Sequence, residues 1–164
     1  MVLSNGNFVV KSPFWHCLES GNASCGAATW IDARRGLSGV VNATNSLVGV
    51  SGVTSGMVGG DLVGSEVFPL VGGDYVVSGN GVTIAPGLAG TLTRGNGRTG
   101  TTGQVTSANS LVGGHTGDLL GATVTSLPDG AVVVASSSWW GNRGAVTHLR
   151  SRSEERRVGK ECEV

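Results

Sequence analysis

The five residues NSLVG occur twice in this chain of 164 residues, at Asn45–Gly49 and again at Asn109–Gly113. Sliding the sequence along itself extends the match, because at an offset of 64 Gly26 also falls on Gly90. A chain that repeats itself in this way is built from copies of one unit, and each copy buries its apolar face against its neighbours. The repetition therefore predicts a repeat architecture.

Two further matches define the unit. Residues 60–77, GDLVGSEVFPLVGGDYVV, match residues 117–134, GDLLGATVTSLPDGAVVV, at an offset of 57. A third copy occurs at an offset of 124, where Trp15 falls on Trp139, so the chain begins inside one unit and ends inside another. The matches divide the repeats, residues 1–151, into a partial unit at 1–49, a full unit at 50–113 and a partial unit at 114–151.

Glycine, valine, serine and threonine dominate the composition, with 29 glycines in the chain. Such a composition favours short strands joined by tight turns. The turn sequences VGG and PDG stand between apolar runs, as in β-hairpins, because Gly and Asp tolerate positive φ. After each hairpin we expect a Gly-Ala strand such as GAATW and a fourth strand at SGVV or GQVT.

Four strands in a unit of roughly 55 to 65 residues are typical of a propeller blade, although the unit is longer than the common propeller repeats. The sequence therefore predicts an all-β repeat fold, a partial β-propeller of about two to three four-stranded blades. A β-solenoid is the alternative, but its coils are usually much shorter than this unit.

The ordered motifs NSLVG, GDLVG, NGNFVVKSPFW, GAATW and GLSGVV also carry a family resemblance. The series resembles the repeat module found in tandem in large bacterial secreted proteins of the filamentous-haemagglutinin type. More distantly, its order is similar to the blades of integrin-α (FG-GAP) propellers. These resemblances imply a structural or adhesion module, extracellular or on the bacterial cell surface, whose partners are neighbouring repeats of the same parent chain and a protein or glycan ligand.

Integrin-type blades carry a calcium loop of alternating Asp and Asn residues. The corresponding loops here are SNGNF, VGGDY and LPDGA, which contain at most one carboxylate each. Calcium takes six to eight oxygen ligands, several of them charged. We therefore expect Asn7, Asp74 and Asp129 to shape turns, and we expect no metal site.

Catalytic chemistry has weak support. His16, His115 and His148 could join Asp32, Asp61 or Asp118 and a serine in a hydrolytic triad, but they are scattered over different elements and favour a surface role. No GxSxG elbow, P-loop or zinc spacing occurs. We expect no catalytic residue, no cofactor site and no enzyme; the alternative is a glycan-binding or carbohydrate-acting propeller.

For several residues that recur in the repeat we expect structural roles. Asp61 and Asp118 recur beside glycine, and we expect each to accept hydrogen bonds from its own turn. Trp15 and Trp139 recur as well, with Val82 at the corresponding position of the middle unit. We expect the tryptophans to pack between units, with a contact surface for glycan or protein as the alternative.

Cysteine usage and the C-terminal residues stand apart from the repeat. Cys17 and Cys25 fall in one loop, and because the other copies have no cysteine there, we expect both to lie outside the core of the repeat, where they could pair or stay free. Residues 152–162, RSEERRVGKEC, match the in-frame translation of a common sequencing-library adapter, so we expect 152–164 to be a non-native tail outside the fold. Cys162 then leaves the cysteine count.

The net charge of zero argues against nucleic acid as a partner, because phosphate binding needs clustered Lys and Arg. No run of about 18 apolar residues occurs, so we expect no membrane insertion. The N-terminus has no charged region followed by an apolar one, so we expect export to be directed from outside this chain.

Overall fold

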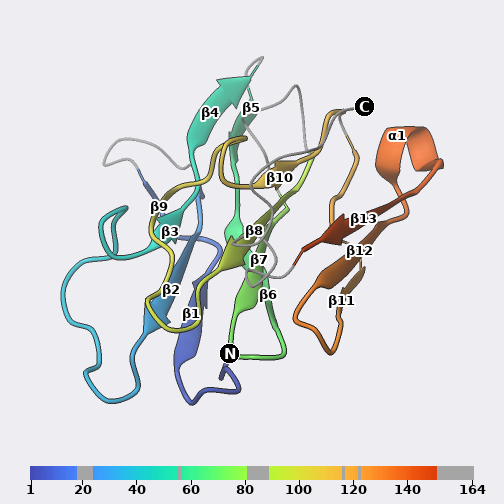
Figure 1. The fold of residues 1–164 in the computed structure, drawn as a ribbon. Coiled ribbons are helices and arrows are strands. Elements are labelled where there is room, and N and C mark those ends of the chain that lie inside the picture. The colour runs from blue at the N-terminus through green and yellow to red at the C-terminus, as the bar shows by residue number, and fades with distance from the viewer. Residues whose placement is uncertain (18–23, 55–56, 81–88, 116, 122, 151–164) are drawn as a thin grey trace.

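The computed structural model describes residues 1–17, 24–54, 57–80, 89–115, 117–121 and 123–150 (Figure 1). In the first half of the chain the strands are β1 (Phe8–Ser12), β2 (Ala27–Ile31), β3 (Leu47–Val48), β4 (Ser51–Thr54), β5 (Met57–Gly60), β6 (Val63–Pro69) and β7 (Tyr75–Gly79). The second half adds β8 (Thr91–Gly95), β9 (Gly103–Gln104), β10 (Leu111–Val112), β11 (Thr123–Ser126), β12 (Val132–Ser136), α1 (Trp139–Asn142) and β13 (Ala145–Leu149).

These strands form three sheets that follow one another along the chain. The first sheet has the order β1-β2-β3-β9, the second β10-β8-β7-β6 and the third β11-β12-β13, and β4 pairs with β5 in a separate hairpin. Figure 1 shows the three sheets side by side in chain order. Apart from the parallel pair of β3 and β9, the strand pairs are antiparallel.

A separate apolar core lies between each pair of consecutive sheets. The core between the first and second sheets contains Leu3, Val9, Ala28, Leu47, Val63, Val67, Tyr75, Val77 and Val105. The core between the second and third sheets contains Leu70, Val76, Leu92, Leu120, Val132 and Val134. The second sheet is therefore covered on both faces, and apolar residues of each sheet are buried where a neighbouring sheet packs on them.

The hairpin turns confirm the turn chemistry expected from the sequence. In three turns the N–H of a leucine donates at 2.8 Å to the carbonyl four residues later; these leucines are Leu3, Leu70 and Leu127. A glycine with φ between 83° and 94° precedes that carbonyl, namely Gly6, Gly73 or Gly130. Only glycine adopts this backbone without strain, so the same turn recurs in each unit.

The predicted position of the fourth strand is wrong. SGVV at 38–41 forms no strand, and of GQVT only Gly103–Gln104 does, but as β9 it pairs with β3 of the preceding sheet. The fourth strand of a unit is instead the Leu-Val pair of NSLVG, which forms β3 beside β2 and β10 beside β8. The turn before NSLVG reverses the chain, so the segment after it returns antiparallel to the Gly-Ala strand.

The described part of the chain is thus nearly all β-structure arranged in repeated units, and its sheets do not close into a ring. Val82 and the tail at 152–164 lie outside the described residues, so the expectations for them stay predictions. Among the described residues, no helix is long and apolar enough to cross a membrane.

Candidate functional site

The junction between units is built around NSLVG, beginning with its asparagine. Asn45 Oδ1 accepts a hydrogen bond from the Asn42 N–H at 3.0 Å, and its Nδ2 donates to the Val40 carbonyl at 2.9 Å. Asn109 makes the same two bonds, each 2.8 Å long, with the residues three and five positions before it. The asparagine therefore closes the turn that delivers the Leu-Val strand.

The serine of NSLVG fastens that strand to its neighbour in the sheet. Ser46 Oγ lies 2.8 Å from Thr29 Oγ1 on β2, and Ser110 Oγ lies 2.6 Å from Thr93 Oγ1 on β8. Both threonines are buried, so each hydroxyl needs a partner. This explains why Thr recurs in GAATW and GTLT.

The glycine of NSLVG permits a close backbone approach. Gly49 N–H donates to the Gly26 carbonyl at 3.0 Å, and a Cβ on Gly49 would overlap the Cys25 carbonyl. Gly113 makes the equivalent 3.1 Å bond to Gly90 and is equally crowded. A larger residue would push the strand away from the segment that begins the Gly-Ala strand.

The Leu-Val pair of the first unit accepts a strand from the next unit. The N–H groups of Gly103 and Val105 donate to the carbonyls of Ser46 and Val48 at 3.1 and 2.9 Å, so that β9 lies parallel to β3. Leu47 is only 1% exposed. The Leu-Val pair of β10 is half-buried, because no further strand pairs with β10 among the described residues.

The recurring aspartates bind the residue that follows NSLVG. Asp61 Oδ2 accepts from the Val50 N–H at 2.5 Å, and Asp118 Oδ2 accepts from the Gly114 N–H at 2.9 Å. Both carboxylates are fully buried. Asp118 also serves its own turn, as expected, whereas Asp61 binds a residue eleven positions before it, and both aspartates hold the end of the preceding unit's last strand.

Asp118 has further partners that gather in one cluster. Its carboxylate accepts from the N–H groups of His115 and Trp140 at 2.8 and 2.9 Å, and His115 Nδ1 lies 3.7 Å from Oδ2. Burial by itself raises the pKa of Asp118, but the three backbone donors and the histidine outweigh it, so the pKa lies below its ordinary value. The carboxylate therefore stays charged and serves the backbone.

His115 and Trp140, whose backbone N–H groups bind this carboxylate, also pack their rings together. The rings of His115 and Trp140 are 4.8 Å apart, and the Arg143 guanidinium is 5.7 Å from the Trp140 ring. Trp140 is 54% exposed and has a φ of 45°, which is unusual for a bulky residue. The group therefore places an exposed tryptophan beside a cation at one end of the third sheet.

The remaining candidate catalytic residues do not come together. His16 lies after β1 and His148 lies in β13, and both are exposed, as is His115. Asp32 accepts from the N–H two residues later in its own turn, at 2.8 Å. His115 and Asp118 alone of the six approach each other, and that pair is engaged in the loop just described.

In the loops that resemble calcium loops, the Asn7 and Asp74 side chains bind other loops, whereas Asp129 acts within its own turn as expected. Asn7 Oδ1 accepts from the Ala33 N–H at 3.1 Å, and Asp74 Oδ1 accepts from the Gly97 N–H at 3.0 Å. Asp129 accepts from the N–H two residues later, at 2.9 Å. Within the described ranges, no three His, Cys, Asp or Glu residues gather closely enough to hold a metal ion.

Cys17 and Cys25 form a disulfide, which settles the pairing that the sequence left open. Cys25 is also buried, contrary to the expectation that both cysteines lie outside the core. It occupies the position of Ala89 in the second unit, which is buried as well. One end of this variable loop is therefore anchored in the junction between units, where the Cys25 carbonyl accepts from Val63 at 3.0 Å.

The recurring tryptophans differ in their surroundings. Trp139 packs against the core between the second and third sheets, which confirms the expected packing role for that copy. Trp15 is half-buried, and its carbonyl accepts from the Gly26 N–H at 3.0 Å. Each tryptophan follows an equivalent strand of its unit, Trp15 after β1 and Trp139 after β12.

A cleft of about 490 Å³ lies between the loop that follows β2 and the loop that follows β8. Its lining includes Trp30, whose Nε1 donates to the Gly97 carbonyl of the next unit at 3.1 Å. Arg35 and Arg98 line it from the two loops. The cleft could not be found from the sequence, because its two loops belong to different units.

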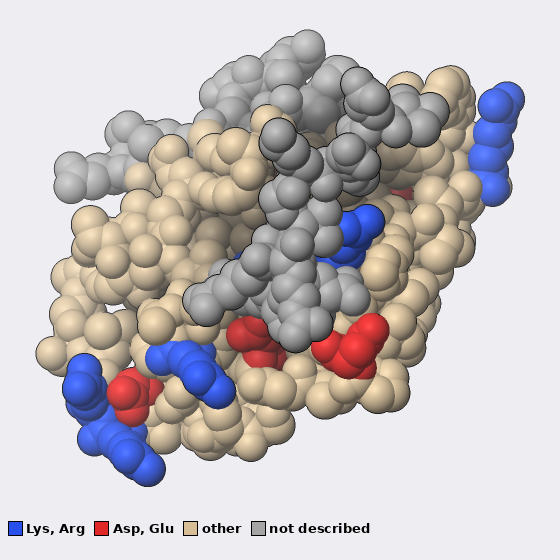
Figure 2. All heavy atoms as spheres, viewed as in Figure 1, with Lys and Arg blue, Asp and Glu red and all other residues tan. Residues whose placement is uncertain are grey.

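On the face of the molecule shown in Figure 2, the described charged residues form no broad surface of one sign. On the face shown in Figure 2, Lys and Arg side chains lie singly or in a small group beside Asp and Glu. Lys11 and Glu66 form an ion pair at 2.9 Å, and Arg94 and Asp74 form one at 3.3 Å.

Successive β-sheet units joined by recurring backbone contacts define a β-repeat protein. The chain belongs to the family described as a repeat of unknown function (DUF5650), whose model matches residues 2–60 and 69–122. The two matches cover successive copies of the same motifs. No curated protein and no solved structure matches the chain.

Proposed function

We propose that this chain is a non-enzymatic structural module of a large exported bacterial protein, which stacks β-sheets into a framework that presents loops for adhesion. The recurrence of one junction carries the proposal. Gly26 lies against the backbone of Val63, and Gly90 lies in the same way against Leu120. A contact that is kept while the surrounding loops vary is what a structural repeat requires.

The variable loops support the adhesion part of the proposal. They connect β1 to β2 and β12 to β13, and they carry Phe14, which is 73% exposed, and Trp140, which is 54% exposed. Exposed aromatic side chains on loops held by a rigid framework are typical of binding surfaces. The Cys17–Cys25 disulfide favours an oxidising compartment, such as the cell exterior.

For the complete array we propose a β-propeller. The support comes from the second sheet, whose four antiparallel strands have the make-up of a blade and whose two faces pack on the adjacent sheets. Small-angle scattering from arrays of increasing length tests this. A closed disc keeps a compact radius of gyration, whereas a solenoid lengthens in proportion to the number of repeats.

Binding to bacterial or host surfaces tests the proposed role. In an array of these units, Phe14→Ser and Trp140→Ser should reduce binding to cells or to a glycan array without changing the unfolding midpoint. Val71→Ser is the matched control, because Val71 is also exposed but lies in a hairpin turn of the repeated framework. Turnover of a sugar substrate by the array would contradict the non-enzymatic role, and binding that survives both loop substitutions would contradict the role of the loops.

A further inference from the structure

Each sheet turns one face towards the next sheet along the chain, and we call this its front face. The front faces of the first and second sheets carry two apolar residues at equivalent positions of the repeat, and none is more than 1% exposed. They are Val9 and Ala28 in the first sheet and Val76 and Leu92 in the second. The following sheet covers each pair.

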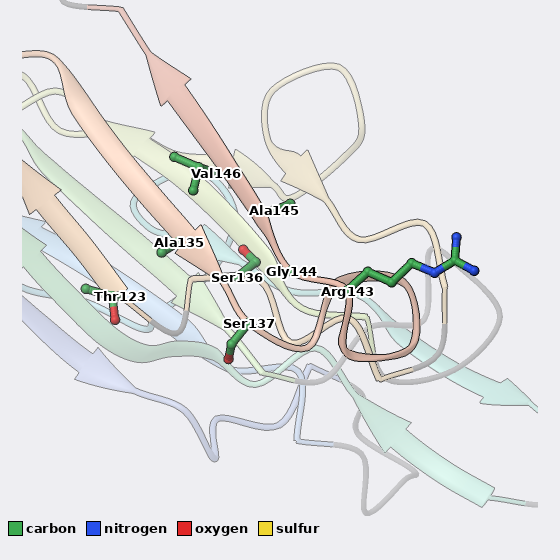
Figure 3. Close-up of a pocket in the computed structure, with 8 residues that line it drawn as sticks. All are labelled: Thr123, Ala135, Ser136, Ser137, Arg143, Gly144, Ala145 and Val146. Atoms are coloured by element: carbon green, nitrogen blue, oxygen red, sulfur yellow. The ribbon is translucent and has the colours of Figure 1, made fainter.

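In the third sheet the equivalent residues are Val133 and Val146, and Val146 is 76% exposed. The register of the strands places Thr123, Ala135 and Val146 in one row across the sheet, as Figure 3 shows. A hollow of about 450 Å³ lies over this row. The third sheet therefore presents a front face that has the residue pattern of a junction but no sheet on it among the described residues.

The face of each sheet opposite its front face is its back face, and the back face of the first sheet is uncovered among the described residues. Val77 and Val134 lie on the back faces of the second and third sheets and are 1% and 0% exposed, because the preceding sheet covers them. The equivalent residue of the first sheet, Val10, is 43% exposed. The uncovered front face of the third sheet and the uncovered back face of the first sheet are thus the two kinds of face that form a junction.

We infer that the front face of the third sheet binds the back face of the first sheet of a second copy of this chain, in a head-to-tail assembly. A second copy fits this face because a front face and a back face already pack on each other twice within the chain. The inference rests on the proposed structural role and names the surface through which the module finds its neighbour.

The charged and polar rim of the internal junctions fits this packing. Trp30 and Arg94 stand at equivalent positions, and each donates to a carbonyl of the next unit, Gly97 at 3.1 Å and Gly130 at 3.0 Å. His148 has the same position in the third sheet and is exposed. In the assembly its ring reaches a backbone carbonyl of the second copy.

Because the two faces differ, the contact is heterologous, and every open assembly keeps one free face of each kind. A substitution that blocks one face therefore leaves the other competent. Val146→Glu blocks the front face and Val10→Glu the back face. Both side chains are exposed in the single chain, so neither substitution places a charge in a formed core.

Sedimentation equilibrium of the full chain over a range of concentrations tests the inference. The wild-type chain should self-associate, and each glutamate variant alone should do so at least ~100-fold more weakly, because it buries an unpaired carboxylate. An equimolar mixture of the two variants should form one-to-one dimers and nothing larger, since it contains one intact front face and one intact back face. Val71→Glu, exposed in a hairpin turn, should associate like the wild type.

A wild-type chain that stays monomeric at ~0.5 mM, or variants that do not pair when mixed, would overturn the inference. Self-association that survives both substitutions would do the same, since another surface would then be in use. These outcomes are separate from the adhesion test, because Phe14 and Trp140 lie in loops outside both faces. Loss of self-association with intact surface binding overturns the assembly alone.

Discussion

The two copies of NSLVG have identical residues and matching hydrogen bonds, but different burial. In both, the asparagine closes its turn, the serine meets a threonine and the glycine approaches the preceding backbone. Leu47 and Val48 are nevertheless 1% and 3% exposed, whereas Leu111 and Val112 are half-buried. The difference is β9, which covers β3 and has no counterpart beside β10 in the described part of the chain.

This difference teaches that the polar residues of the motif act locally, while its apolar residues depend on the neighbouring unit. Hydrogen bonds within a turn span a few residues and form wherever the turn forms. Burial of Leu and Val needs a second surface, which another unit supplies. Substitutions made in matched pairs should therefore agree between the copies at the polar and glycine positions and disagree at the apolar positions.

The largest effect is expected at the leucines. Leu47→Ala should lower the free energy of unfolding by about 3 kcal/mol, since it leaves a cavity in a filled core, and Leu111→Ala by about half as much. Equilibrium urea denaturation of both variants measures this. Equal losses would mean that β10 is covered as fully as β3, contrary to the comparison.

The glycines should give a large effect that is the same in both copies. Gly49→Ala and Gly113→Ala each place a Cβ against a backbone carbonyl, which cannot rotate away. Each should cost roughly 2 kcal/mol, the scale of overpacking in a core. Thermal and urea unfolding provide the measurement, with Gly114→Ala as control because a Cβ there meets open space. A tolerated alanine at either site would show that the strand can shift.

The asparagines should give a smaller and again equal effect. Asn45→Ala and Asn109→Ala each remove two side-chain bonds to the backbone, which should cost about 1 to 1.5 kcal/mol. Ser107→Ala, in the same turn of the second unit and exposed, should change stability by less than ~0.5 kcal/mol. The comparison fails if Asn109→Ala is neutral while Asn45→Ala is not.

The smallest effect is expected in acid and concerns Asp118, which holds the residue after the second NSLVG. Its folded pKa is lowered, so it contributes stability above its unfolded pKa of about 3.9, and this stability is lost as the pH falls through the lower folded value. Asp118→Asn should therefore be less stable than the wild type at pH 6, and the two should converge as the pH falls below 3.9. Urea unfolding at a series of pH values measures this. A constant difference would contradict a charged role for Asp118.

Much of the local structure could be predicted, because it depends on nearby residues. The hairpin turns follow from glycines that must take positive φ. The asparagine turns are equally local, since the side chain reaches the backbone within five residues, but they were not predicted. The fourth strand could not be assigned correctly, because SGVV and NSLVG both have strand composition. Only the turn closed by Asn45 decides which of them returns beside β2.

The candidate site was harder to foresee than the fold. The buried position of Cys25 follows from the close approach of Val63, and the cleft beside Trp30 is formed by loops of two units. The cluster of His115, Trp140 and Arg143 depends on a loop whose backbone is held by Asp118. Sequence spacing carries no information on such contacts, since the residues are brought together by the packing of one sheet on the next.

By itself, the sequence determined that the protein is made of repeated all-β units and that each unit contains the same turns, because strand and turn preferences are local properties. The tertiary structure alone decided which strands pair across units, which copy of the Leu-Val pair is buried and which sheet faces have no sheet packed on them among the described residues. The physical reason is that apolar burial is a property of two surfaces in contact. A repeat encodes both surfaces in every copy, but only the neighbour that is present decides which of them are covered.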